Sequence, residues 1–122
     1  MGRPDIDVQR TAYSPDILTA TITISTSTTV SAEVDLDGGH LFAISTPSAL
    51  TGTAITFKVS DVSGGTFNDL YDDTGTKYSV VVAPSRVIYL DPTKFAAFRY
   101  IKLVSGSAEA ADRVIKLFTR VV

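Results

Sequence analysis

The stretch from 53 to 90 constrains the fold of this chain most, because short alternating runs in it are separated by tight-turn residues. Apolar residues of 54–60 alternate with polar ones, the period of two that places one face of a strand on a core and the other in water. SGG at 63–65 and DDTG at 72–75 supply the residue types that hairpin turns require. The stretch therefore predicts antiparallel strands joined by hairpins.

The same alternation recurs along the rest of the chain. It predicts further strands over 20–25, 30–36, 40–46, 86–90, 98–104 and 113–122. The apolar run Leu41–Ile44 is typical of a central strand covered on both faces. Asp91 followed by Pro92 predicts a single helical turn, with Asp91 as its N-cap.

These strands have no crossover helices between them, which excludes parallel β/α arrangements. Thr, Val and Ile make up 38 of the 122 residues, and branching at Cβ suits a pleated sheet. We expect one all-β domain, an antiparallel β-sandwich of jelly-roll or Greek-key type over 20–122, preceded by an extended N-terminal arm over 1–19. The residues predicted to lie between the sheets are Ile22, Ile24, Val34, Leu36, Phe57, Val59, Val80, Ile101, Leu103, Ile115 and Leu117.

The first 19 residues lack a clean period and carry Pro4 and Pro15, which favour extended backbone around them. A frayed terminus is one interpretation. The alternative is an arm that crosses onto a neighbouring molecule, because it is more apolar than a solvated tail needs to be. The predicted partner-binding residues of this arm are Ile6, Val8, Tyr13, Ile17 and Leu18.

Composition excludes several classes of function. A formal net charge of −2 does not draw the molecule to nucleic acid or to an anionic membrane, and no apolar run is long enough to span a bilayer. The chain has no cysteine and one histidine, so neither disulfides nor a transition-metal site is expected. We expect no cofactor, no nucleic-acid partner and no membrane partner, and no signal peptide is evident.

Catalysis is not expected either. A serine hydrolase would have His40 as its single base, and the chain has no Gly-x-Ser-x-Gly motif. Asp69, Asp72 and Asp73 are close in sequence and could act as acid and base, but aspartate is also favoured in solvated turns. Asp35-x-Asp37-Gly38 resembles the start of a calcium loop but lacks the glycine spacing and closing glutamate of an EF-hand. Oxygen ligands for calcium could also converge if two loops meet, namely those of Asp61, Asn68, Asp69, Asp72 and Asp73.

Two further binding hypotheses depend on strand residues. Tyr71, Tyr78 and Tyr89 are candidates for a sugar-stacking platform, although strand tyrosines more often cover a core or an edge. A modest basic group on the last two strands could bind nucleic acid, but isolated strand cations usually protect an edge from aggregation. That group is Arg99, Lys102, Arg113, Lys116 and Arg120. The linker SGSAEAAD at 105–112 is predicted to be a mobile loop.

Three phrases of the sequence suggest a family: GGTFNDLYDDTG, LDPTKFAAFRYIKL and the closing alternating strand. Over residues 20–122 they resemble small all-β virion proteins encoded among the structural genes of tailed bacteriophages. FRYIKLVSG also resembles a core strand of discoidin-like, galactose-binding sandwiches. These motifs are structural, and no binding residue transfers with them.

The resemblance implies a non-enzymatic virion structural protein, most simply a capsid decoration (cement) protein on the outer capsid shell. Its expected partners are the major capsid protein, copies of itself, or both, as a homo-oligomer in the virion with the arm bridging neighbours. The alternative is a tail or head-fibre module that binds host-surface carbohydrate or acts as an adaptor.

Overall fold

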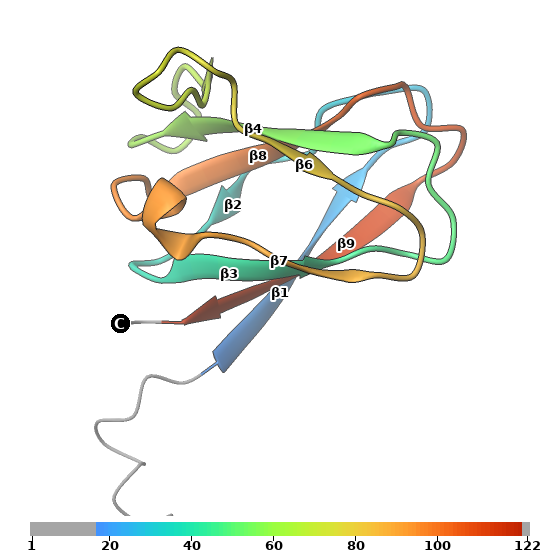
Figure 1. The fold of residues 1–122 in the computed structure, drawn as a ribbon, viewed down its shortest axis with the longest axis horizontal. Helices are drawn as coiled ribbons and strands as arrows, with labels where there is room; N and C mark the ends of the chain where they lie inside the picture. The colour runs from blue at the N-terminus through green and yellow to red at the C-terminus, as the bar shows by residue number, and fades with distance from the viewer. Residues whose placement is uncertain (1–16, 121–122) are drawn as a thin grey trace, which may run out of the picture.

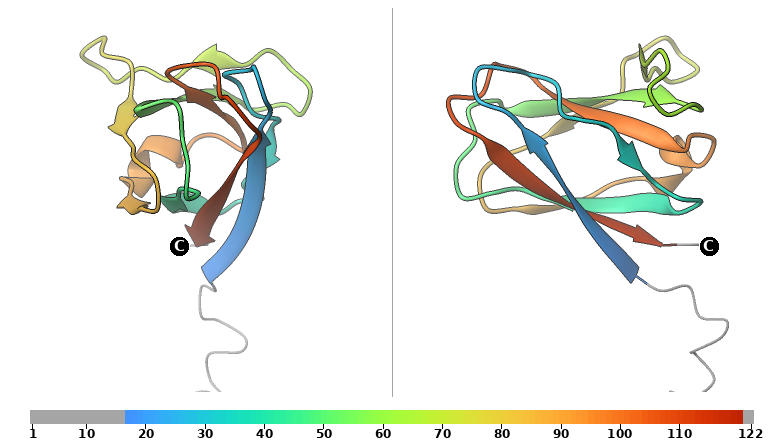
Figure 2. Two further views of the ribbon diagram at one scale, coloured as in Figure 1. Left: turned by 90° about the vertical axis from the view of Figure 1, so that its right-hand side faces the viewer. Right: turned by 180° about the vertical axis from the view of Figure 1, so that it is seen from behind.

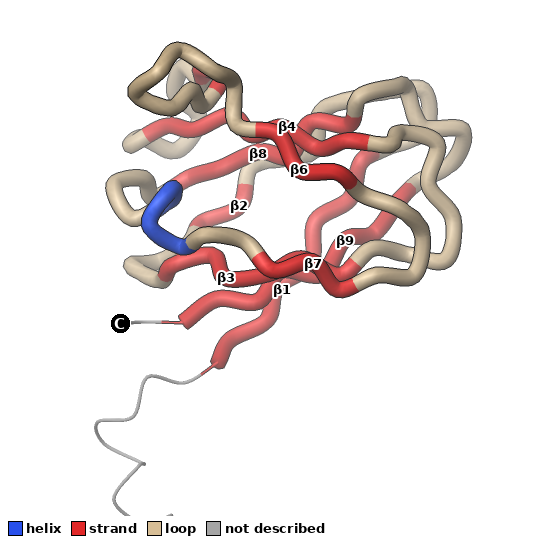
Figure 3. Tube along the Cα trace, in the orientation of Figure 1, coloured by secondary structure: helices blue, strands red, loops and turns tan. Residues whose placement is uncertain are grey.

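The computed structural model describes residues 17–120, which form two antiparallel sheets packed face to face (Figure 1). In chain order the strands are β1 (Ile17–Ile24), β2 (Val34–Asp35), β3 (His40–Ser45), β4 (Ala54–Ser60), β5 (Asn68–Asp69), β6 (Ser79–Val81), β7 (Val87–Tyr89), β8 (Tyr100–Ser105) and β9 (Arg113–Arg120). A 3-10 turn, η1 (Pro92–Phe95), is the one helical element in this range (Figure 3). The all-β prediction is confirmed.

The strand order is that of a jelly roll. One sheet, here called the β1 sheet, has the order β1-β9-β3-β7. The other, the β4 sheet, has the order β2-β8-β4, with β5 and β6 both pairing along the remaining edge of β4. Each of the first three connections crosses from one sheet to the other, which produces the two interlocked Greek keys of this architecture.

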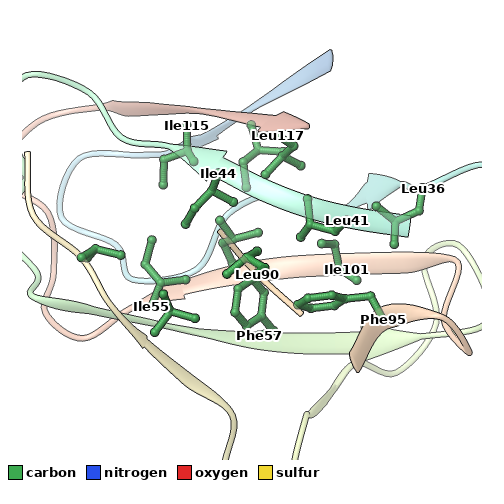
Figure 4. Close-up of a cluster of buried hydrophobic side chains, with 14 of the residues drawn as sticks. Leu36, Leu41, Ile44, Ile55, Phe57, Leu90, Phe95, Ile101, Ile115 and Leu117 are labelled. Atoms are coloured by element: carbon green, nitrogen blue, oxygen red, sulfur yellow. The ribbon is translucent and has the colours of Figure 1, made fainter. Parts of the chain in front are cut away.

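Alternation places the predicted core between the sheets (Figure 4). Ile55, Phe57 and Val59 of β4 face inward, and the rings of Phe95 and Tyr78 pack against Phe57 with centroids 5.0 and 5.5 Å away. Of the residues predicted to be buried, Val34 alone is only partly so. Leu41, Ile44, Val82, Leu90 and Phe95 complete the core.

Three local predictions were wrong, and the first concerns the arm. β1 begins at Ile17, so the sandwich starts before the predicted boundary at residue 20. Ile17 and Leu18 pair with Arg120 and Thr119 of β9, because residues 17–24 continue one unbroken register along that strand.

The apolar run in β3 has a different cause from the predicted one. The register between β3 and β9 shifts by one residue between Leu41 and Ala43, a β-bulge at Phe42. The bulge lets both Leu41 and Ile44 point into the core, while Phe42 and Ala43 are only half-buried. Burial of one face of β3, together with the bulge, therefore explains the apolar run over 41–44.

The strand predicted over 30–36 is reduced to β2 and an isolated bridge between Val30 and Val104. Ser31 is the buried residue there, at 4% exposure, instead of Val30 or Ala32. Its hydroxyl accepts a hydrogen bond from the Leu103 N–H, and its own N–H donates to the Leu103 carbonyl. This side-chain bond takes the place of regular strand pairing.

The turn predictions were confirmed. Gly64 and Gly75 adopt positive φ angles of 69° and 87° in the two hairpin turns. The Asp91 side chain accepts a hydrogen bond from the Thr93 N–H and caps η1. The start of β1, the end of β9 and η1 all lie at one end of the sandwich (Figures 1 and 2).

Candidate interaction surfaces

The predicted partner-binding residues fall in two parts of the chain. Ile6, Val8 and Tyr13 lie outside the described residues. Ile17 and Leu18 belong to β1, where Leu18 lies opposite Thr119 and is 50% exposed. The structure thus assigns two of the five to an edge strand of the sandwich instead of to an arm.

The acidic residues near the hairpins are held by cations and backbone groups. Asp69 on β5 lies 3.0 Å from Lys58 Nζ and 3.2 Å from Lys77 Nζ, and these two lysines, Lys58 foremost, lower the pKa of its carboxyl group. The Asp72 carboxylate accepts hydrogen bonds from the hydroxyl and N–H of Thr74 and from the Thr76 N–H, which lower its pKa. Asp72 therefore closes its own turn, as turn chemistry favours.

A second acidic group lies on the same sheet and is also paired. Arg99 makes a two-pronged contact with Asp35, at 2.9 Å from Nε and 3.1 Å from Nη2, and this contact lowers the pKa of Asp35. Asp37 is 3.6 Å from the same guanidinium group. Glu33 accepts hydrogen bonds from the Ser63 hydroxyl and the Gly64 N–H, which lower its pKa. Among residues 17–120 no group of three or more His, Cys, Asp or Glu side chains could hold a metal ion.

The basic residues of the last two strands do not form a stripe. Lys102 of β8 lies on the outer face of the β4 sheet, 4.6 Å from the centre of the Phe67 ring. Lys116 of β9 lies on the outer face of the β1 sheet, on the opposite side of the molecule. Arg113 is bound to Glu109. A continuous basic surface for nucleic acid is therefore not present in this part of the chain.

His40 and the tyrosines are equally dispersed. His40 opens β3 beside the turn at 37–39 and pairs with Arg120, a strand-end position as predicted. Tyr78 packs with the core rings of Phe57 and Phe95. Tyr71, in the hairpin beside β5, and Tyr89, on β7, are 53% and 76% exposed but lie on different sheets. The structure thus contradicts a three-tyrosine platform.

The linker over 105–112 contains a buried site that the sequence did not indicate. Glu109 is 1% exposed, and its carboxylate accepts hydrogen bonds from the N–H groups of Thr51 and Gly52, at 2.8 and 2.9 Å. The Ser105 hydroxyl donates to it at 2.6 Å and Arg113 Nε at 2.9 Å. The linker is therefore anchored to the 46–53 loop, contrary to the mobile loop predicted.

Burial alone raises the pKa of Glu109. The hydrogen bonds from Ser105, from the backbone of Thr51 and Gly52, and from Arg113 outweigh that effect and bring the pKa from 4.5 down to about 2. The site is closed around its carboxylate: a Cβ at Gly52 would lie 2.1 Å from the Ser105 hydroxyl oxygen. We interpret it as a structural tie between two loops. A glutamate four residues before an arginine, within a run of small residues, is the only signal the sequence offered for it.

The outer face of the β1 sheet has a different character from these paired groups. Tyr89 and Val87 of β7 are 76% and 67% exposed, and Val114 of β9 is 51% exposed. Ala43 and Phe118, both half-buried, lie in register between Tyr89 and β1. Threonines of β1 continue the face to its edge. This combination of apolar side chains and hydroxyls is typical of a contact surface.

Comparison with known proteins identifies a fold relative. No family model matches the chain, and no curated protein matches it in sequence. The crystal structure of the SPBc2 prophage-derived protein YomS superposes with a TM-score of 0.58 at 16% identity, over 88% of this chain and 96% of that one. At this identity the likeness is one of fold: the chain has the same all-β architecture as a protein derived from a prophage. No helix in residues 17–120 is long and apolar enough to cross a membrane.

Proposed function

We propose that this chain is a non-enzymatic structural protein of a bacteriophage virion, and specifically a decoration protein that binds the outer capsid shell. The observation that carries the proposal is the likeness of nearly the whole jelly roll to a prophage-derived protein. The acidic residues support it, because those nearest the hairpins are engaged in ion pairs and turns instead of converging on a reaction centre.

The binding surface of this proposal combines the arm with the outer face of the β1 sheet. The arm enters the fold through β1, so its apolar residues Ile6 and Val8 precede the strand that borders this face. Burying such side chains and Tyr89 against the shell would contribute about 25 cal/mol per Å² of apolar area, before ordering costs.

The test is co-sedimentation of the purified protein with capsids of the encoding phage that lack it. We expect the full chain to bind, and the triple variant Ile6→Asn, Val8→Asn, Tyr13→Asn to bind at least about tenfold more weakly. The matched control changes polar positions of the same segment, Asp5→Asn, Asp7→Asn and Gln9→Ser, and should bind like the wild type. Equal binding by both triple variants would exclude the arm from the contact.

A tail or head-fibre module is the second candidate, because the exposed Tyr71 ring has Lys77 Nζ 5.8 Å from its centre and could stack on a sugar. Cryo-electron microscopy of the virion separates the two functions. A decoration protein covers the head at many sites, whereas a tail module forms one small ring. Absence of the protein from purified virions would exclude both.

A further inference from the structure

The free sheet edges of this sandwich differ greatly in length. β2 and β5 are two residues long and each carries an aspartate, Asp35 or Asp69. β6 and β7 are three residues long. Short edge strands and edge charges are the usual means by which a sandwich avoids pairing with other chains. β1 uses neither of them.

β1 is an eight-residue edge strand with the sequence ILTATITI, which contains no charge, no proline and no glycine. Among the strands of residues 17–120 it pairs with β9 alone, in an unbroken register over all eight residues, and no strand of this range lies along its other edge (Figure 2). In an antiparallel ladder alternate residues direct their N–H and C=O groups away from the partner. Half of the backbone groups of β1 therefore face its open edge.

We propose that β1 pairs antiparallel with β1 of a second copy of this chain, about a two-fold axis through Thr21. The two β1 sheets then join into one continuous eight-stranded sheet, with both cores on the same side. This dimer contact goes beyond the proposed function and holds whether or not the chain belongs to a virion.

The alternating pattern of the strand is self-complementary, with its longest symmetric stretch centred on Thr21, and this supports a second copy as the occupant. From Leu18 to Ile24 the residues read apolar, Thr, apolar, Thr, apolar, Thr, apolar, the same in either direction about Thr21. Antiparallel pairing about Thr21 sets Thr19 opposite Thr23 on the outer face, and opposed threonines stabilise strand pairs. An isologous contact requires such self-complementarity, whereas a foreign strand does not.

The side chains of the inner face are compatible with the same register. Pairing about Thr21 sets Leu18 opposite Ile24 and Ala20 opposite Ile22 of the second copy. Leu18 is 50% exposed in the single chain, while Ile22 and Ile24 are buried in its own core. A second copy would thus cover an apolar side chain that the single sandwich leaves at its margin. Shifting the register by one residue would instead turn one copy's core to the opposite face.

Electrostatic repulsion between the two copies does not oppose this contact. Lys116, which lies opposite Thr21 on β9, is the charged side chain of the outer face closest to the proposed axis. It would be three strand spacings, about 14 Å, from Lys116 of the second copy. That separation exceeds the Debye length at physiological ionic strength, about 8 Å, so the repulsion is largely screened.

A cysteine scan tests both the contact and its register, because the chain has no cysteine of its own. Thr21→Cys places the two thiols opposite one another at the axis, and mild oxidation or a short thiol cross-linker should convert the protein to a covalent dimer. Thr23→Cys alone should not cross-link, since its two thiols would lie four residues apart along the pair, about 13 Å. A mixture of Thr19→Cys and Thr23→Cys should cross-link to each other.

Charge variants test the same axis without covalent chemistry. Thr21 is exposed on an edge strand, so Thr21→Lys and Thr21→Glu should each leave the monomer folded. Each should raise the dimer dissociation constant about tenfold or more in sedimentation equilibrium, because like charges then meet at the axis. An equimolar mixture of the two should regain the dimer. Ser79→Lys, at an exposed position of β6, is the matched control and should dimerise like the wild type.

Three results would overturn the proposal. The first is a wild-type chain that stays monomeric at the highest soluble concentration. The second is a dimer that Thr21→Lys and Ser79→Lys weaken equally. The third is equal cross-linking of Thr21→Cys and Thr23→Cys, which indicates random collision or open-ended aggregation instead of a two-fold contact.

Discussion

The two sheets enclose one core, but their outer faces differ in whether the side chains already have partners within the chain. On the β4 sheet Asp69 binds Lys58 and Lys77, and Asp35 binds Arg99. On the β1 sheet Val87 and Tyr89 of β7 are exposed at one edge, and the threonines of β1 lie at the opposite edge. A face whose charges already pair within the chain gains little from a partner, because that partner would have to desolvate them. Over most of its area, the outer face of the β1 sheet has no paired charges that a binding partner would have to desolvate.

The largest expected effect lies in the core that the two faces share. Phe57→Ala should reduce the free energy of unfolding by about 3–5 kcal/mol, because its fully buried ring packs against Phe95 and Tyr78. The matched control is Phe118→Ala on the outer β1 face, where the ring is only half-buried and the loss should be about 1 kcal/mol. Denaturant unfolding measures both. Equal losses would show that burial does not distinguish the faces as described.

The next effect concerns the loop tie at the end of the sandwich. Glu109→Gln replaces one acceptor oxygen by an NH2 group that faces N–H and O–H donors, and should cost about 3 kcal/mol at neutral pH. Asp112→Asn, in the same loop but exposed, should cost much less. Urea unfolding at pH 7 gives both values.

The same carboxylate predicts a pH dependence. Its pKa is about 2 in the folded chain and near 4.5 when unfolded, so it stabilises the fold above pH 4.5. That contribution, about 3 kcal/mol, should be lost as the pH falls from about 5 to 2. The difference in stability between wild type and Glu109→Gln should therefore shrink over this window. A difference that stays constant with pH would contradict an ionised Glu109.

A smaller effect is expected on the β4 face. Asp69→Asn removes the partner of both Lys58 and Lys77 and should lower the melting temperature slightly, since the pairs are at the surface. About 1 M salt should remove the difference by screening. If salt leaves it unchanged, the ion pairs are not its cause.

The smallest effect on stability is expected from replacing one exposed valine on the outer face of each sheet. These two variants also test the difference between the faces most directly. Val87→Ser on the β1 face and Val81→Ser on the β4 face replace two highly exposed valines, at 67% and 77%, and each should change stability by less than about 0.5 kcal/mol. Under the proposed function only Val87→Ser should weaken capsid binding, by roughly tenfold. Weaker binding by Val81→Ser alone would assign the contact to the opposite face.

Local patterns predicted much of the fold. Alternation over 54–60 gave β4 and its buried residues, the glycine-containing turns gave the hairpins, and Asp91 with Pro92 gave η1. Each of these depends on residues a few positions apart. The jelly-roll class followed because strand number and spacing leave few alternatives in one small domain.

The failures depend on partners distant in sequence. Nothing near Glu109 shows that Thr51 and Gly52 will donate to it across more than 50 positions. The Ser31 hydroxyl bonds to Leu103, and this long-range bond overrides a convincing local alternation. For the partner-binding residues, the sequence indicated an apolar N-terminal segment but not that Ile17 and Leu18 pair with β9.

The pairing of β1 with β9 also sets the order in which the molecule can fold during synthesis. β9 follows every other described strand, yet it separates β1 from β3 in the sheet. At 5–20 residues per second the ribosome needs roughly 5–20 s to make the chain between these two strands. For that interval ILTATITI lacks the strand with which it pairs in the folded molecule, and it is accessible to chaperones or to other nascent chains. Substitutions in β1 should therefore alter the yield of soluble protein more than the stability of molecules that have folded.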